Sequence, residues 1–392
     1  MSTAPDVASR GARPWNVIVA PDSFKGSASA QEIAAAMAAG WRQARPTDRL
    51  TVLPQADGGE GTMAAVAASV PRARWHVVGK PVCGPDRRPV QARWLELPGS
   101  VAVVELAESS GLPLMAHPCP TRATSRGLGQ VIRAALDAGA RRIVVGLGGS
   151  ASTDGGAGAL LELGLRLYDE NDRRLDITDA LDLGRVARID STGLAPLPPD
   201  GVEVLADTTA PLCGPSGAAH TFGAQKGADA DTRQALDLAL GHFGALAGHA
   251  FGISTAEPGT GAAGGAGFGL RAWGASLVPG AERINQLTGL TASLRTTDLV
   301  ITGEGCFDRT SSGGKLVGTV LRQCAAHGVR SLVVAGRLMA TPPDLGVELA
   351  ATAGTADAAI AAPFTHARSA TRMVAETVHE PTAFGMPGAQ ST

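Results

Sequence analysis

Short apolar runs, each followed by a loop rich in Gly and Asp and then by a helical segment, recur towards both ends of this chain. The run 16–20 leads through an acidic loop to a helix that begins at Ser29, where Ser29 and Glu32 form the pattern of a capping box. Similar runs lie at 50–53 and 299–302. Because strands that alternate with helices build parallel sheets covered by helices, the sequence predicts an α/β fold with a doubly wound sheet.

The middle of the chain has a different texture. Two β-like runs at 90–97 and 101–105 are separated by a Pro-Gly turn, which favours a hairpin. Strand–helix alternation then returns at 142–145. A length of 392 residues is enough for two domains. The Pro-, Gly- and Ser-containing ends, 1–14 and 381–392, are expected to be a flexible leader and a flexible tail.

Charge and cysteine usage exclude several classes of protein. The chain carries 34 basic and 36 acidic side chains, so it offers no basic field for nucleic acid or an anionic membrane. No run approaches the ~18 apolar residues that span a bilayer, and the first residues lack a signal-peptide core. Five scattered Cys, with no CxxC pair, favour a reduced compartment. We therefore expect a cytoplasmic protein without nucleic-acid or membrane partners.

Carboxylates follow several of the predicted strands, in loops rich in Gly, Ser and Thr. Open α/β sheets bind their ligands at the carboxyl ends of the strands, so these positions predict a functional site. Asp and Gly are also common turn formers, and a carboxylate can simply cap a helix or complement its dipole, as Asp154 and Glu60 could do here. The full set is Asp22, Asp57 with Glu60, Asp154, Asp207, and Glu304 with Asp308.

The basic residues are unevenly distributed between 30 Arg and four Lys. Codon bias explains the ratio, but three of the Lys (Lys25, Lys226 and Lys315) lie in the Gly-rich, acid-bearing segments. A compact ammonium beside a phosphate would explain those positions. Glycine loops that bind phosphate, carboxylates that bind Mg²⁺ and lysines that neutralise a transferred phosphoryl group together indicate phosphoryl transfer.

Two literal motif matches fail on their context. The segment 259–264 reads GxGxxG, but no convincing strand precedes it, as a dinucleotide site requires. The segment 313–316 ends like a phosphate-binding Walker A loop, but it lacks the Ser or Thr after Lys315.

Several segments, in order over roughly residues 15–340, together resemble the bacterial type I glycerate kinase family. This resemblance implies a flavodoxin-like domain built from both chain ends, 15–80 plus 285–380, with a second mixed α/β domain, 81–284, inserted between them. The segments that carry it are APDSFKGS at 20–27, ADGGEGT at 56–62, GLGGSA at 146–151, DGGAG at 154–158, PLCGP at 211–215, FGAQKGA at 222–228, GAAGG at 261–265 and ITGEG at 301–305.

The resemblance implies an ATP- and Mg²⁺-dependent enzyme that phosphorylates D-glycerate, most commonly at the 2-hydroxyl to give 2-phosphoglycerate. On this basis Asp207 is expected to be the general base, Lys25 to stabilise the transferred phosphoryl group, and Glu304 with Asp308 to hold Mg²⁺. The nucleotide would be bound by Gly148, Gly149, Ser150, Asp154, Lys226 and Lys315. The acceptor would be bound by Asp22, Ser23, Asp57, Gly58, Gly59 and Glu60, with Arg126.

The sequence also departs from the family pattern. Cys306 and Thr310 stand where the family usually has Arg and Gln, and Arg126 replaces a usual Tyr. If the missing Arg binds the substrate carboxylate, Arg309 or Arg126 is a candidate to replace it. Glycerate 3-kinase, a related hydroxy-acid kinase with another acceptor, and a non-catalytic nucleotide-binding homologue therefore stay open. So does the oligomeric state, for which a homodimer is one candidate.

Overall fold

The computed structural model describes residues 13–312 and 316–378. Most of the expected leader, all of the expected tail and Lys315 lie outside these residues. The chain forms two compact units, and they are described separately here. The first unit comprises Met1–Leu53, Ala292–Gly313 and Val320–Thr392, and the second comprises Pro54–Thr291 and Gly314–Thr319.

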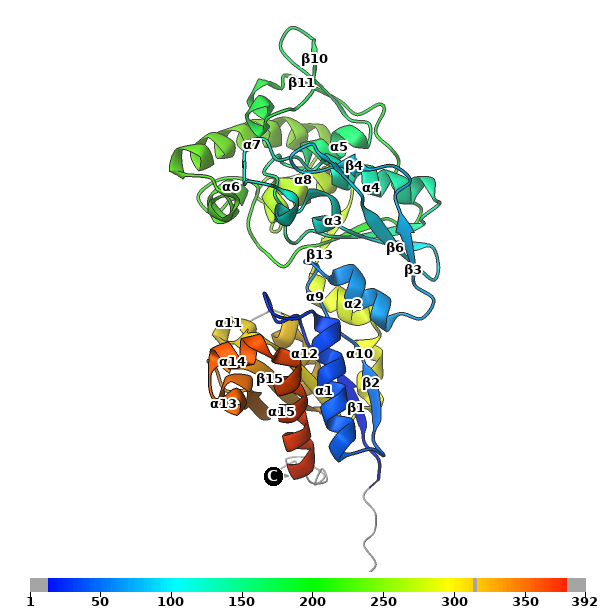
Figure 1. Cartoon of the computed structure of the whole chain (residues 1–392). Helices are drawn as coiled ribbons and strands as arrows, with labels where there is room; N and C mark the ends of the chain where they lie inside the picture. The colour runs from blue at the N-terminus through cyan, green and yellow to red at the C-terminus, as the bar shows by residue number, and fades with distance from the viewer. Residues whose placement is uncertain (1–12, 313–315, 379–392) are drawn as a thin grey trace, which may run out of the picture. The chain divides into compact units, whose positions relative to one another are not determined.

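The first unit is built on a five-stranded, wholly parallel sheet (Figure 1). Counted along this unit, the strands lie in the order 2-1-3-4-5, which is that of flavodoxin-like sheets. The expected α/β class with a parallel sheet is therefore confirmed. Across the sheet the strands are β16 (Leu345–Glu348), β15 (Arg330–Leu338), β14 (Leu299–Phe307), β1 (Asn16–Val19) and β2 (Arg49–Val52).

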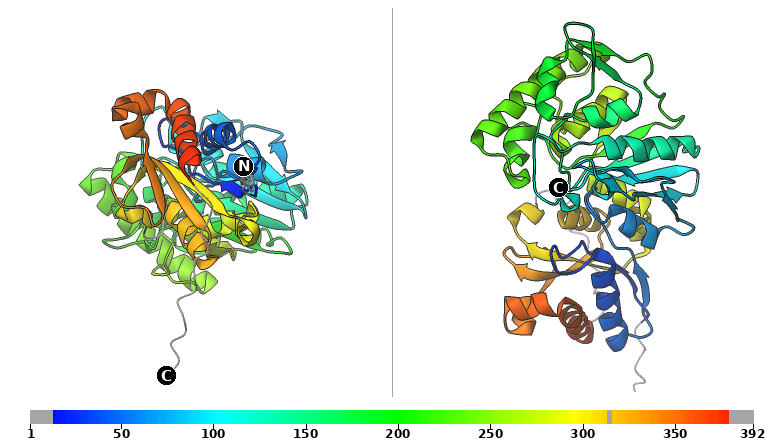
Figure 2. Two further views of the ribbon diagram at one scale, coloured as in Figure 1. Left: turned by 90° about the horizontal axis from the view of Figure 1, so that it is seen from below. Right: turned by 45° about the horizontal axis from the view of Figure 1, so that its top comes forward.

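Helix α1 (Ala30–Ala44) and helix α15 (Pro363–Thr377), from opposite ends of the chain, lie side by side in this unit (Figures 1 and 2). The capping box at the start of α1 is confirmed, because the Ser29 Oγ accepts a hydrogen bond from the backbone N–H of Glu32. The contact is close at Gly40, where a Cβ would lie 2.1 Å from the carbonyl oxygen of Arg368.

The remaining helices of the C-terminal part of the chain are short. They are α10 (Leu290–Ser293), α11 (Arg309–Ser312), α12 (Leu316–Ala326), α13 (Leu349–Ala353) and α14 (Ala356–Ala361).

The second unit contains a six-stranded mixed sheet, in the order β13-β12-β8-β7-β6-β3. The first four strands in that order are parallel to one another, β6 runs antiparallel to β7, and β3 runs antiparallel to β6. The expected hairpin is confirmed as the antiparallel pair β6 and β7. The strands are β3 (Arg74–Val77), β6 (Arg93–Leu97), β7 (Val101–Glu105), β8 (Arg142–Gly146), β12 (Val202–Leu205) and β13 (Ser276–Val278), with smaller pairings among β4 (Val82–Cys83), β5 (Pro89–Val90), β9 (Arg166–Tyr168), β10 (Arg174–Leu175) and β11 (Arg188–Asp190).

Both faces of this sheet are buried, as is typical of parallel strands covered by helices. Val104 and Val145 point into the larger core, whereas Val103 and Val144 point into a second cluster on the other face. The helices of the unit are α2 (Thr62–Ser69), α3 (Ala107–Ser110), α4 (Arg126–Asp137), α5 (Ala157–Glu162), α6 (Ala218–Phe222), α7 (Ala230–Phe251), α8 (Ala262–Trp273) and α9 (Gly280–Leu287).

The packing of α2 explains why the first unit ends at Leu53, whereas the domain segment expected from the family resemblance runs to residue 80. Met63 and Val66 of α2 share a buried cluster with Val103 and Val144 of the second sheet. A helix that buries its apolar side chains on this sheet belongs to it, whatever the local composition suggests. Within residues 13–312 and 316–378, no helix combines the length and the apolar character that crossing a membrane requires.

Candidate active site

The Gly-rich and acidic loops of the second unit gather at one edge of its sheet. Strand β7 ends at Glu105 and β8 ends at Gly146, while Asp207 and Gly280 follow the ends of β12 and β13. Because these four strands are parallel, their carboxyl ends lie at the same edge, which is where open α/β sheets bind ligands.

Asp207 follows β12, and its side chain contacts the first residue of α9. Its Oδ1 accepts a hydrogen bond from the backbone N–H of Gly280, with an N–O distance of 2.7 Å. A Cβ on Gly280 would lie 3.0 Å from the other Asp207 carboxylate oxygen and 2.1 Å from the carbonyl oxygen of Asp57. Only glycine therefore fits between these two acidic residues.

The residue Asp207 stays partly open to solvent, but the surrounding protein changes how its carboxyl titrates. Partial burial raises the pKa of Asp207 to about 6, and the negative charges of Asp57 and Glu282 act in the same direction. The N–H groups of Gly280 and Ala281 oppose this shift. The carboxyl is therefore ionised at neutral pH, yet basic enough to accept a proton from an attacking hydroxyl.

Two predicted binding loops, 57–60 and 146–150, pack backbone against backbone. The N–H of Gly148 donates to the carbonyl oxygen of Gly58 over 3.2 Å. A Cβ on Gly148 would lie 2.2 Å from the Cα of Gly59, so the approach depends on glycine. The Asp57 carboxylate accepts the N–H of Gly59, which closes the turn, while Glu60 is exposed.

The second loop continues into a segment that a buried lysine holds. The ammonium Nζ of Lys226 donates to the Oγ of Ser150 over 2.9 Å and to the carbonyl oxygen of Ser152 over 2.5 Å. Lys226 is only 1% exposed. Burial lowers the pKa of its ammonium to about 7, and the negative charge of Asp154 opposes the shift. Gly149, in contrast, is exposed at the turn of the loop.

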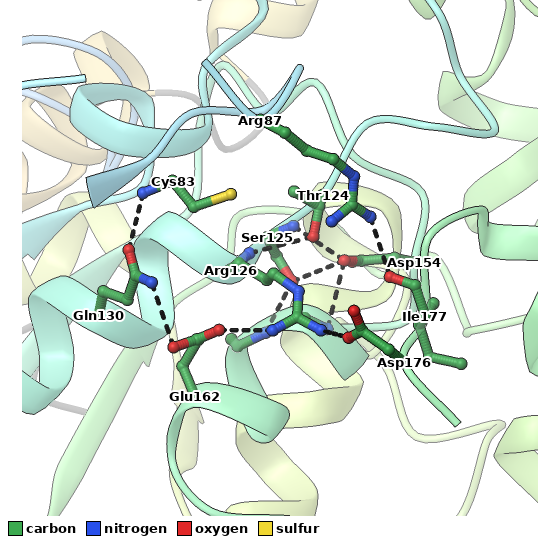
Figure 3. Close-up of polar contacts among 12 residues, drawn as sticks. Cys83, Arg87, Thr124, Ser125, Arg126, Gln130, Asp154, Glu162, Asp176 and Ile177 are labelled. Atoms are coloured by element: carbon green, nitrogen blue, oxygen red, sulfur yellow. Dashed lines mark hydrogen bonds and ion pairs between the residues drawn. The ribbon is translucent and has the colours of Figure 1, made fainter. Parts of the chain in front are cut away.

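Asp154 is buried and surrounded by donors from two elements (Figure 3). Its Oδ2 accepts from the backbone N–H and the Oγ of Ser125, each over 2.8 Å. At the start of α5, the backbone N–H of Gly156 donates to the Asp154 Oδ1, and that of Gly158 donates to the Oδ2. These contacts join the loop to the beginnings of α4 and α5. The predicted contact between Asp154 and a nucleotide stays a prediction.

The first unit gathers its own group of predicted site residues. Asp22 and Ser23 follow β1, and the N–H of Asp22 donates to the carbonyl oxygen of Gly303 in β14, one residue before Glu304. Lys25 is exposed, and its backbone N lies 3.8 Å from where a Cβ on Gly305 would be. The topology therefore brings together residues that are 280 or more positions apart in the sequence.

Asp308 lies at the end of β14 and begins the short helix α11. Its Oδ1 accepts from the N–H groups of Thr310 and Ser311 and from the Thr310 hydroxyl. Among the residues that the structure describes, no group of three or more Asp, Glu, His or Cys is placed to hold a metal ion. Carboxylates such as those of Glu304 and Asp308 are of the type that suits Mg²⁺, which needs only one or two carboxylates beside water and phosphate oxygens. Their predicted contact with Mg²⁺ stays a prediction.

Comparison with known proteins identifies the family. A family model described as the glycerate kinase family matches residues 17–381. The chain belongs to this family. A relative from Escherichia coli (strain K12), named glycerate 2-kinase, is 40% identical over 76% of this chain and 79% of its own length. A relative from Bacillus subtilis (strain 168), named glycerate kinase, is 39% identical over 82% of this chain and 85% of its own length.

A solved structure supports the same assignment. The crystal structure of a Salmonella typhimurium LT2 protein, assigned as glycerate kinase 2, superimposes on this chain with a TM-score of 0.81 at 35% identity. The match covers 93% of this chain and 98% of that one. The expected family, the α/β class and the expectation of a glycerate kinase activity at the family level are therefore confirmed.

One residue at which this chain departs from the pattern expected of a glycerate kinase takes part in an ion-pair network (Figure 3). The guanidinium of Arg126 contacts the carboxylates of both Glu162 and Asp176. Gln130 donates to Glu162 and accepts the N–H of Cys83. Arg126 therefore already balances two negative charges, and its predicted contact with the acceptor stays a prediction.

The expectations for this glycerate kinase family member did not include Glu105, which the structure places among the site loops. Its 4% exposed carboxylate accepts the N–H groups of Gly61 and Met63. The pattern was visible in the sequence, because Glu105 directly follows the apolar run 101–104, as other selected acids follow their strands. Because β7 was assigned to a hairpin, the sequence did not indicate that it also pairs in parallel with β8 and so ends at the same edge as the other site loops.

Proposed function

We propose that this chain is a glycerate kinase that transfers the γ-phosphoryl group of ATP to the 2-hydroxyl of D-glycerate, giving 2-phosphoglycerate. Family membership supports the reaction class, and the relative named glycerate 2-kinase supports the position on the acceptor. The observation that carries the proposal is the solvent-accessible Asp207 carboxyl, with a pKa of about 6, at a sheet edge beside two glycine loops.

Asp207 is proposed as the general base. As the acceptor hydroxyl attacks phosphorus, its proton passes to an Asp207 carboxylate oxygen, and the bond from phosphorus to the leaving ADP oxygen breaks. The hydrogen bond from Gly280 keeps the carboxylate oriented throughout this step. Asp57, Gly58, Gly59 and Glu60 would shape the acceptor pocket, to which Asp22 and Ser23 are also assigned.

The loop that contains Gly148, Gly149 and Ser150 is proposed to bind nucleotide phosphates through its backbone N–H groups. In this proposal Lys226 acts through Ser150, because its buried ammonium already donates to the Ser150 hydroxyl. The exposed Lys25 is proposed to supply positive charge to the transferred phosphoryl group. Lys315, assigned to the nucleotide as well, lies outside the described residues.

Glu304 and Asp308 are proposed to hold Mg²⁺, directly or through water. When bound with the nucleotide, this ion would neutralise charge on the phosphate oxygens. The chain's own contribution is to hold Asp308 at the start of α11, where Thr310 and Ser311 orient its carboxylate.

A coupled assay with D-glycerate and ATP tests the proposal, and phosphorus NMR of the product distinguishes the 2-phosphate from the 3-phosphate. We expect turnover with glycerate and a 2-phosphate product. A 3-phosphate product contradicts the proposed position, and preference for another hydroxy acid contradicts the acceptor. ATP binding without turnover of any acceptor would identify a non-catalytic homologue.

We propose further that the enzyme acts in the reducing cytoplasm without nucleic-acid or membrane partners. All five cysteines are free thiols in the structure, which agrees with such a compartment. A homodimer is the proposed assembly, and analytical ultracentrifugation distinguishes it from a monomer.

A further inference from the structure

Glu105 is a buried acid at the carboxyl end of a parallel strand, and the catalytic scheme above gives it no task. It is the last residue of β7 and pairs in register with Gly146, the last residue of β8, after which the glycine loop continues. Its exposed fraction is 4%. Acidic side chains are almost never buried to this extent unless a partner compensates the charge.

The partners of this carboxylate are backbone N–H groups at the start of α2. Oε1 accepts from Gly61 over 2.8 Å, and Oε2 accepts from Met63 over 3.1 Å. Gly61 is the N-cap of α2 and has a left-handed φ of 88°. Two oxygens of one carboxylate therefore satisfy two N–H groups that the helix itself leaves unpaired, and the helix dipole favours the negative charge.

Gly61 directly follows the 57–60 loop, so the carboxylate holds the point at which this loop becomes a helix. The other end of the loop is held by the Asp57 carboxylate through Gly59 and by the contact between Gly58 and Gly148. Among the described hydrogen bonds, Glu105 is the one side chain that accepts from the N–H of Gly61, and it comes from β7.

We propose that Glu105 is a positioning residue for the acceptor, which sets the geometry of the 57–61 loop by holding Gly61 and Met63 with its two carboxylate oxygens. The inference rests on the proposed function in one respect, namely that this loop binds the acceptor. It adds a specific consequence: binding of the acceptor depends on the charge of Glu105, whereas binding of ATP does not.

The charged side chains that act on Glu105 are Glu108, Glu60 and Arg93. Burial raises the pKa of Glu105 to about 7, and the negative charges of Glu108 and Glu60 add to the increase. The N–H groups of Met63 and Gly61 oppose it. Arg93 interacts with Glu105 but forms its close ion pair, 2.7 Å, with Glu108.

Protonation changes what the side chain can accept. An ionised carboxylate accepts both N–H groups well, whereas a protonated acid has one hydroxyl oxygen that accepts weakly and brings a donor that needs its own partner. The hydrogen bonds from Gly61 and Met63 to Glu105 therefore weaken as the pH falls through about 7. We expect the KM for the acceptor to rise over that interval.

The test compares wild type, Glu105→Gln and the control Glu108→Gln. Steady-state kinetics with D-glycerate and ATP are measured from pH 6 to pH 9. At pH 8 we expect Glu105→Gln to raise the glycerate KM about tenfold and to leave the ATP KM within about twofold. Its glycerate KM is also expected to lose the pH dependence that wild type shows near 7. At pH 8 Glu108→Gln is expected to keep both wild-type KM values, and the pH dependence of its glycerate KM should move to lower pH, because the negative charge of Glu108 adds to the raised pKa of Glu105.

A second measurement does not depend on activity. Hydrogen exchange of a peptide that covers residues 57–66 is followed by mass spectrometry at one pH for all three proteins. Glu105→Gln is expected to exchange faster in this peptide and not elsewhere in the second unit. If Glu105→Gln does not fold, Glu105→Asp replaces it, because the shorter side chain keeps the charge but cannot reach both N–H groups.

Equal increases in both KM values, an unchanged glycerate KM, or unchanged exchange in this peptide would overturn the inference. A wild-type enzyme without glycerate kinase activity would instead contradict the proposed function. In that case faster exchange at 57–66 in Glu105→Gln would still support the positioning role of Glu105, and unchanged exchange would refute it.

Discussion

The ammonium group of Lys226 lies 2.9 Å from the hydroxyl oxygen of Ser150 and is almost completely removed from solvent. Because this ammonium is buried and donates to Ser150, it stabilises the loop that contains Ser150 and does not itself face solvent. Lys25 is in the opposite situation, since it is exposed after β1. Two lysines that look alike in the sequence therefore have different surroundings, and different substitutions test them.

Replacement of Lys226 by Arg is expected to damage the glycine loop. The guanidinium is larger than the ammonium, and overpacking a buried site costs about 1–3 kcal/mol of folding free energy. We expect a lower melting temperature and a higher ATP KM, measured by calorimetry and steady-state kinetics. The exposed Lys80, replaced by Arg, is the matched control. A Lys226→Arg enzyme with wild-type values for both would refute the supporting role.

The titration of Lys226 also predicts a pH-dependent stability. Its pKa is about 7 in the folded protein, below the 10.5 of an exposed lysine. Between these values the unfolded chain binds more protons, so stability rises with pH at a limiting rate of about 1.4 kcal/mol per pH unit. Urea unfolding of wild type and Lys226→Met at pH 6.5, 8 and 9.5 measures the effect. A wild-type advantage that does not grow with pH would contradict it.

Asp207→Asn tests the general base. We expect kcat to fall by a factor on the order of 10² to 10⁴ with little change in the KM values, because the amide cannot accept the hydroxyl proton. In wild type, kcat should decline as the pH falls below about 6, where the carboxyl becomes protonated. Asp200→Asn, at an exposed residue paired with Arg141, is the control. Near wild-type turnover in Asp207→Asn would remove Asp207 from the catalytic role.

Gly148→Ala tests the contact between the two loops. The added methyl group would lie 2.2 Å from the Cα of Gly59, and neither backbone can yield without moving its loop. We expect a loss of about 1–3 kcal/mol in unfolding free energy and a fall in kcat/KM of about tenfold or more. Gly241→Ala in α7 is the comparison, because a Cβ there meets nothing within 4 Å. That variant should gain about 0.5–1 kcal/mol, since glycine is unfavourable within a helix.

Lys25→Arg tests whether the reaction needs a compact ammonium. Arg keeps the charge but spreads it over a planar group, so we expect kcat to fall about tenfold while the melting temperature is unchanged. Kinetics at saturating glycerate and ATP give the answer. Near-full activity would show that the position of Lys25 among the acidic loops is coincidental.

The regular elements were accessible from the sequence because their signals are local. The capping box at Ser29, the run that becomes β1 and the hairpin formed by β6 and β7 each depend on residues only a few positions apart. The sequence could not predict which of the two sheets α2 packs against. Its apolar residues are compatible with either neighbouring sheet, and only the packing of Met63 beside Val103 decides between them.

The candidate site divides in the same way. Asp207 and Gly148 could be selected from the sequence, because acids and glycines that follow apolar runs indicate the carboxyl edge of a parallel sheet. Lys226 could be selected because it is one of only four lysines and lies in a Gly-rich segment. The surroundings of Asp154 and Arg126 could not. Each is satisfied by partners from other segments, and sequence spacing carries no information about such partners.

For this protein, the sequence alone was enough to predict which loops form the site and to find the family that they resemble, because residue types and their order are local properties. The tertiary structure alone decided what each charge faces. Lys226 is a buried ammonium that donates to Ser150, Asp207 is a partly exposed acid with a raised pKa, and Glu105 is a buried carboxylate that accepts the N–H groups of Gly61 and Met63. The physical reason is that burial and hydrogen-bond partners, which control the charge and reach of a side chain, arise only when distant segments pack together.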